Sequence, residues 1–114
     1  MNIKIISKPI TKAEALEIAK EFYVDMVKGV ADLEKEIIAL GGEYHIDANN
    51  VLIDNSSIQK NLWGFNIYPK KKGNNWIEYT SLINIRPTAN NKSMEVEDKK
   101  IRLAIKKIID KLVI

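Results

Sequence analysis

The chain has 114 residues, a length typical of one domain, and 46% of them are hydrophobic. It contains no cysteine, which excludes disulfides, thiolate metal sites and cysteine nucleophiles. Charged residues interrupt every apolar run, so the sequence indicates neither a signal peptide nor a membrane span. We therefore expect one soluble, cytoplasmic domain over residues 1–114.

The formal net charge is +3, and only Arg86 and Arg102 among the 18 basic residues are arginines. Planar, bidentate recognition of phosphate or guanine favours arginine over lysine. This lysine bias argues against a nucleic-acid partner. Acidic residues predominate in residues 11–40 and basic residues in residues 98–114, which suits packing of these two segments against each other.

In chain order, residues 2–7 predict a short strand, and residues 11–40 predict one long amphipathic helix. Thr11 and Glu14 form a capping box pattern at its start, and Gly41-Gly42 mark its end. Apolar residues recur between these signals at spacings of three and four, and a second apolar row widens the face. So wide a face predicts a homodimer through the long helix; the alternative is that the C-terminal helix covers the second row.

After Gly42 the hydrophobic period changes to two, which predicts strands at residues 43–47, 51–54, 61–68 and 76–86. Asp98 is placed to cap a C-terminal helix. Strands clustered between helices, without β-α alternation, are typical of an α+β fold. We expect an antiparallel sheet of four or five strands packed against the long N-terminal helix and the C-terminal helix.

Alternation along the strands assigns polar side chains to one face of this sheet. Trp63, Phe65 and Ile67 point to the core, and the face opposite is expected to be open to water or a ligand. His45 and Asp47, on the strand predicted at residues 43–47, are expected to point to the same face. Its other predicted members are Asn66, Tyr68, Trp76, Glu78, Asn84 and Arg86.

The first functional hypothesis is a binding or interaction module that uses this polar face. Asn66, Glu78, Asn84 and Arg86 would contact a small anionic ligand or a protein partner, between apolar walls formed by Tyr68 and Trp76. The simpler alternative is that these side chains only keep the open face of the sheet hydrated. No cofactor is predicted.

The second hypothesis is a small hydrolase or nuclease-like enzyme with His45 as general base. His45 is the only histidine, and histidine is the side chain that titrates near neutrality. Asp47 would orient it and Arg86 would hold an anion. His45, Asp47 and Glu78 also have the donor atoms for a metal ion. No spacing in the chain matches a recognised catalytic motif.

Four stretches resemble a small family of uncharacterised prokaryotic proteins that is known only as a domain of unknown function. They are GGEYHIDA (41–48), LWGFNIYP (62–69), SLINIRP (81–87) and VED (96–98) leading to Ile101-Arg102. The resemblance implies no activity and no site.

Overall fold

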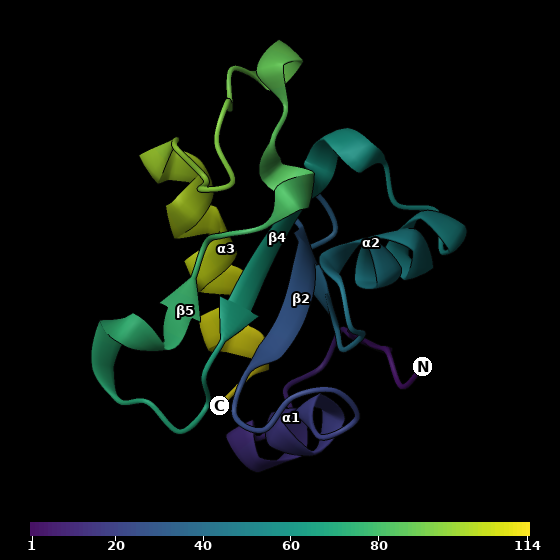
Figure 1. Cartoon of the computed structure of the whole chain (residues 1–114), viewed down its shortest axis with the longest axis vertical. Helices are drawn as coiled ribbons and strands as arrows, with labels where there is room; N and C mark the ends of the chain where they lie inside the picture. The colour runs from purple at the N-terminus through teal and green to yellow at the C-terminus, as the bar shows by residue number, and fades with distance from the viewer.

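A five-stranded antiparallel sheet forms the centre of the computed structural model, which describes all 114 residues (Figure 1). The strands lie side by side in the order β1-β3-β2-β4-β5. The strands are β1 (Lys4–Ile6), β2 (Val27–Asp32), β3 (Ile37–Leu40), β4 (Leu62–Ile67) and β5 (Ile77–Glu78). The helices are α1 (Lys12–Ala19), α2 (His45–Asp54) and α3 (Lys99–Leu112). Short 3-10 turns are η1 (Gln59–Asn61), η2 (Gly73–Trp76), η3 (Leu82–Asn84) and η4 (Pro87–Ala89). The predicted α+β class with an antiparallel sheet is confirmed.

Helices cover both faces of the sheet. On one face α1 and α3 enclose the main core of 19 buried residues, with α3 behind β4 in Figure 1. On the other face α2 packs on a smaller cluster, in which Ala48 and Leu52 meet Val30, Ala39 and Leu62. The prediction of one fully open polar face was therefore wrong, because α2 covers part of it.

The predicted helix over residues 11–40 was also wrong in its length. Its capping box is present, since Glu14 N donates to Thr11 Oγ1 at 3.1 Å and Thr11 N donates to the Glu14 carboxylate at 3.1 Å. The helix ends at Ala19, however, and β2 and β3 form a hairpin in the middle of the sheet. The predicted dimer depended on the apolar face of the longer helix, so this fold gives it no basis.

Burial on both faces explains why β2 was not recognised as a strand. Five of its six residues are buried, so the alternation that identifies a half-buried strand is missing. Asp32 then closes the hairpin, because its Oδ1 accepts from Glu34 N and Lys35 N, both at 3.0 Å. Glu36 completes the turn with φ 55°.

Helix α2 replaces the two strands predicted at residues 43–47 and 51–54. Asp47 Oδ2 accepts from Tyr44 N at 3.0 Å, which satisfies a free N–H at the start of the helix. Ala48 and Leu52 lie one turn apart and face the sheet. Asn49 and Asn50, which lie between the two predicted strands, are in the interior of the helix.

The long strand predicted at residues 76–86 is reduced to β5, which pairs with β4 only at Asn66 and Ile67. Beyond β5 the side chain of Asn84 satisfies the edge of β4. Its Nδ2 donates to Gly64 O at 3.0 Å, and its Oδ1 accepts from Gly64 N at 2.8 Å. Arg86 donates to Leu62 O one step further along. Two side chains thus make the hydrogen bonds that a continued strand would have made.

Helix α3 begins as predicted, since Asp98 Oδ1 accepts from Lys100 N at 2.8 Å. Its buried residues are Ile105, Ile108, Ile109 and Leu112. None of the helices combines the length and the apolar character that crossing a membrane requires.

Candidate functional site

A row of three polar side chains crosses the sheet beneath α2. Lys28 on β2 is the cross-strand partner of Asn66 on β4, and Asn66 is the partner of Glu78 on β5. Paired residues on neighbouring strands project from the same face. His45, the first residue of α2, meets this row at Asn66. Asn66 and Glu78 share a face as the strand alternation predicts, but His45 meets them from a helix and not from the predicted strand at residues 43–47.

The hydrogen bonds of Asn66 determine which nitrogen of His45 carries a proton. Asn66 Nδ2 donates to Glu78 Oε1 at 3.3 Å and to Thr80 O at 3.4 Å, and both of these oxygens only accept. Asn66 Oδ1 therefore faces His45, whose Nε2 lies 2.8 Å from it and 2.9 Å from Phe65 O. Between two acceptors, Nε2 has to be the protonated nitrogen.

The second nitrogen of His45, Nδ1, is left free. Burial lowers the pKa of His45 below its usual 6.5, and the nearby Lys28 ammonium lowers it further, against the raising effect of the hydrogen bonds to Phe65 and Asn66. The ring is therefore neutral at pH 7, and Nδ1 carries a lone pair. Nδ1 has no partner in the protein and is not enclosed, so it is open to a molecule in the adjacent cleft.

We predict a loss of stability on acidification that depends on His45. The unfolded chain binds a proton at His45 near pH 6.5, whereas the folded chain binds it only at lower pH. The contribution of His45 is thus complete above pH 6.5 and decreases as the pH falls from there toward the folded pKa. Urea unfolding at about pH 7 and about pH 5 should show a smaller pH dependence for His45→Gln than for the parent protein. Equal pH dependence in the two proteins would contradict this assignment.

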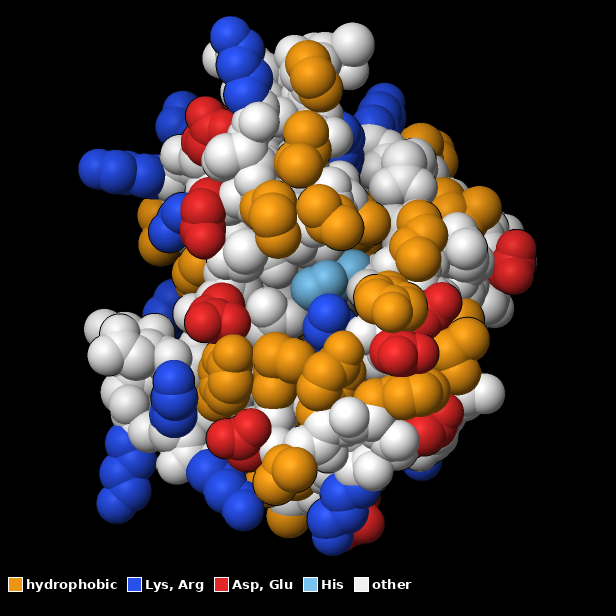
Figure 2. All heavy atoms as spheres, viewed as in Figure 1, with side chains coloured by type: hydrophobic (Ala, Val, Ile, Leu, Met, Phe, Trp, Pro, Cys, Tyr) orange, Lys and Arg blue, Asp and Glu red, His pale blue; other side chains and the backbone are white.

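The cleft beside His45 has a volume of about 430 Å³. Its polar residues are Lys28, His45, Asn66, Thr80 and Ser81, and its apolar residues are Tyr44, Ile46, Leu82, Ile83 and Met94. Figure 2 shows the only histidine of the chain at the bottom of a hollow, with hydrophobic side chains around it and a basic side chain beside it. A mostly apolar wall with a few convergent polar groups is typical of small-molecule sites.

Lys28 is the cation of this cleft. It makes no ion pair; its Nζ lies 5.4 Å from the ring centre of Tyr23 and 5.8 Å from that of Tyr44. Aromatic faces attract an ammonium group but leave its hydrogen-bond donors unused. Lys28 is therefore available to bind an anion.

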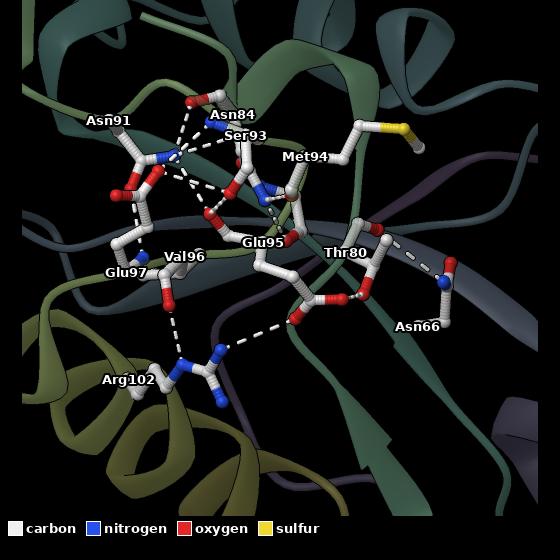
Figure 3. A network of polar contacts seen from close by, with 11 residues as sticks. Asn66, Thr80, Asn84, Asn91, Ser93, Met94, Glu95, Val96, Glu97 and Arg102 are labelled. Carbon is white, nitrogen blue, oxygen red and sulfur yellow. Dashed lines mark hydrogen bonds and ion pairs between the residues drawn. The ribbon is translucent and has the colours of Figure 1, made fainter.

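The loop that carries Met94 is fixed by a network around Asn91 (Figure 3). Asn91 Nδ2 donates to the carbonyls of Asn84, Ser93 and Glu95 at 2.8, 3.0 and 2.8 Å. Backbone hydrogen bonds from Lys92 and Ser93 to the carboxylate of Glu97 lower its pKa below the usual 4.5. One wall of the cleft is thus built before any ligand arrives.

Glu95 joins this loop to its neighbours on two sides. One carboxylate oxygen accepts from Thr80 Oγ1 at 2.6 Å, and the other lies 3.3 Å from Arg102 Nη2 on α3 (Figure 3). Thr80 in turn accepts from Asn66 through its carbonyl. These hydrogen bonds connect the loop that carries Met94 both to the polar row, through Thr80 and Asn66, and to α3, through Arg102.

Of the eight predicted site residues only His45 and Asn66 line the cleft, and four of the others support the fold instead. Asp47 caps the start of α2 and makes no hydrogen bond to His45; Asn66 orients the ring in its place. Asn84 and Arg86 support the edge of β4, and Trp76 is buried in the main core. Each is used in folding.

Tyr68 and Glu78 lie at the end of the polar row. Tyr68 donates to Glu78 Oε1 at 2.9 Å. Burial, together with this hydrogen bond, raises the pKa of Tyr68 to about 12. Glu78 therefore links Tyr68 to Asn66 and, through Asn66, to His45.

The metal hypothesis has no ligand set, because His45, Asp47 and Glu78 do not converge and no group of three acidic or histidine side chains does so elsewhere. Sequence reasoning missed Lys28 and the apolar residues of the cleft. The predicted helix over residues 11–40 includes Lys28, and the predicted strand over residues 76–86 includes Leu82 and Ile83. Only half of a capping box marks this helix start in the sequence, because Asp47 bonds the N–H of Tyr44 but tyrosine supplies no capping side chain.

A family model described as "Protein of unknown function (DUF5674)" matches residues 4–112, which is nearly the whole chain. No curated protein and no solved structure matches this chain.

Proposed function

Since the chain belongs to the DUF5674 family, whose description assigns no function, we propose a function from the geometry of the cleft alone: it binds a small organic anion with an apolar body. The carboxylate of such a ligand would pair with Lys28. An N–H or O–H group of the ligand would donate to His45 Nδ1. The apolar body would lie between Tyr44 and Ile46 on one side and Leu82 and Met94 on the other.

The observation that carries this proposal is an unpaired cation and a free imidazole nitrogen in one apolar cleft. Burial of apolar ligand surface favours binding at roughly 25 cal/mol per Å². The two polar groups would fix the orientation of the ligand. This deepens the original hypothesis of an anion-binding module, but it transfers the contacts from Asn84 and Arg86 to Lys28 and His45.

The test is a titration, monitored by protein NMR, with small aromatic acids that also carry a hydrogen-bond donor. Hydroxybenzoates and indole carboxylates are suitable ligands. We expect Lys28→Met to raise the Kd by about tenfold to a hundredfold, because a charge-assisted hydrogen bond contributes about 1.5–3 kcal/mol. Lys71→Met is the matched control, since Lys71 also lies over an aromatic ring, 4.4 Å from that of Tyr68, but outside the cleft.

Equal weakening by the two lysine substitutions would show a nonspecific charge effect and would contradict the proposal. The uncharged amides of the same acids should bind more weakly than the acids themselves. Binding that is unaffected by Lys28→Met would likewise place the ligand elsewhere.

Proton transfer by His45 is a second candidate, favoured by the neutral ring and the free Nδ1. Asn66 fixes the tautomer from the other side, as a positioning group for a general base does. Ser81 lines the cleft, but its hydroxyl makes no hydrogen bond to His45, so the geometry supports deprotonation of a bound acid without a nucleophile. Exchange of an acidic C–H proton of a bound ligand with D₂O, abolished in His45→Gln, would be its signature.

A further inference from the structure

Leu103 is an exposed apolar side chain within a basic face of α3. It is 61% exposed, and the residues three and four positions away from it are all lysines. We call Leu103 with these four residues (Lys99, Lys100, Lys106 and Lys107) the α3 patch. The buried stripe of α3 lies on its other side, so folding does not require a leucine here.

Most of the positive charge of the α3 patch is unpaired. Lys106 forms an ion pair with Asp110 at 2.5 Å, but Lys99, Lys100 and Lys107 have no carboxylate partner. Two of these lysines lie in the first helical turn, where the helix dipole disfavours a cation. Beside Leu103 is a hollow of about 320 Å³, to which Tyr79 and Arg102 also contribute.

The turn after α1 carries the opposite combination. Val24 is 82% exposed and Phe22 is 40% exposed, and the acidic residues Glu21 and Asp25 flank them. We call these four residues the α1 tip. Tyr23 anchors this turn by donating to Glu43 O, so the two apolar side chains are held outward on a fixed backbone.

We propose that the α3 patch of one copy binds the α1 tip of a second copy. Interfaces between proteins combine an apolar centre with a polar rim, and here the centres are both apolar while the rims have opposite charge. Val24 or Phe22 would enter the hollow beside Leu103. Because the two surfaces differ, the contact is heterologous, and each pair of copies keeps one free patch and one free tip.

Other occupants fit the α3 patch less well. A membrane-bound helix inserts an apolar face, whereas the apolar stripe of α3 is buried in the core and only Leu103 remains. Recognition of nucleic acid favours arginine, and the one arginine of this helix, Arg102, is already bonded to Val96 O and Glu95.

The proposal is tested by mixing two single variants, each of which lacks one of the two surfaces. Sedimentation velocity measures whether the parent, each variant and the mixture associate. The parent protein should associate at high micromolar concentration in low salt, and less so at high salt because exposed charges are screened. Leu103→Glu removes the patch and Val24→Lys removes the tip, so each variant alone should be monomeric. An equimolar mixture keeps one intact patch and one intact tip, and it should form dimers but nothing larger.

Leu82→Glu is the matched control, because Leu82 is an exposed leucine (71%) that lines the cleft and belongs to neither the α3 patch nor the α1 tip. This variant should associate like the parent. All substituted positions are exposed, and circular dichroism verifies that the variants are folded. A parent protein that stays monomeric in low salt would overturn the proposal. So would a mixture of the two variants that remains monomeric, or association that either variant retains.

Discussion

Asn84→Ala should lower the free energy of unfolding by about 3 kcal/mol, because it leaves several buried polar groups without partners at about 1–3 kcal/mol each. Asn84 is fully buried, and its amide bonds both the N–H and the carbonyl of Gly64 as well as Met94 O. Urea unfolding followed by tryptophan fluorescence measures the loss. Because Gly64 lies on β4 close to Asn66, the variant should also weaken ligand binding in the cleft.

The same substitution at Asn50 is the control. Asn50 is exposed on α2 and makes no side-chain hydrogen bond, so Asn50→Ala should change stability by no more than about 0.5 kcal/mol. If Asn84→Ala were equally mild, the edge of β4 would not depend on this side chain, and our account of the missing strand would be wrong.

Gly29→Ala should be destabilising by about 2 kcal/mol, because overpacking a tightly filled core costs about 1–3 kcal/mol. Gly29 lies on the central strand β2 between Leu40 and Phe65. A Cβ atom there would lie 2.4 Å from Phe65 Cζ and 2.9 Å from Leu40 Cδ2, closer than nonbonded carbon atoms approach. The fully buried ring of Phe65 would have to move.

A double-mutant cycle with Phe65→Leu tests this mechanism. Leucine lacks the ring atoms that approach Gly29, so Gly29→Ala should cost less in the Phe65→Leu protein than in the parent. An equal cost in both backgrounds would show that the effect comes from the backbone of β2 and not from the contact with the ring.

The sequence predicted the parts of the fold in which one local pattern dominates. Alternation placed Trp63, Phe65 and Ile67 in the core and Asn66 on the other face, as the structure confirms. Capping chemistry located the starts of α1 and α3. These signals involve neighbours in sequence, so no knowledge of the tertiary structure was needed.

The errors arose where tertiary contacts decide the structure. Val27 and Ala31 are buried against α1 and α3 while Val30 is buried against α2, and burial from both sides gives the apolar spacing of a helix. The candidate site depended on the same contacts. Lys28 reaches His45 only because β2 pairs with β4, and that pairing cannot be seen until residues 27–40 are recognised as a hairpin.

The most direct test of the cleft as a ligand site is the ¹H–¹⁵N correlation spectrum of the His45 ring, recorded with and without a hydroxybenzoate or indole carboxylate. We predict a ring that is protonated at Nε2 and unprotonated at Nδ1 at neutral pH. Ligand should shift the Nδ1 resonance while Nε2 stays bonded to Phe65 and Asn66, and Lys28→Met should remove the shift at the same ligand concentration. A ring protonated on Nδ1, or ligand-induced shifts confined to residues outside the cleft, would contradict the account.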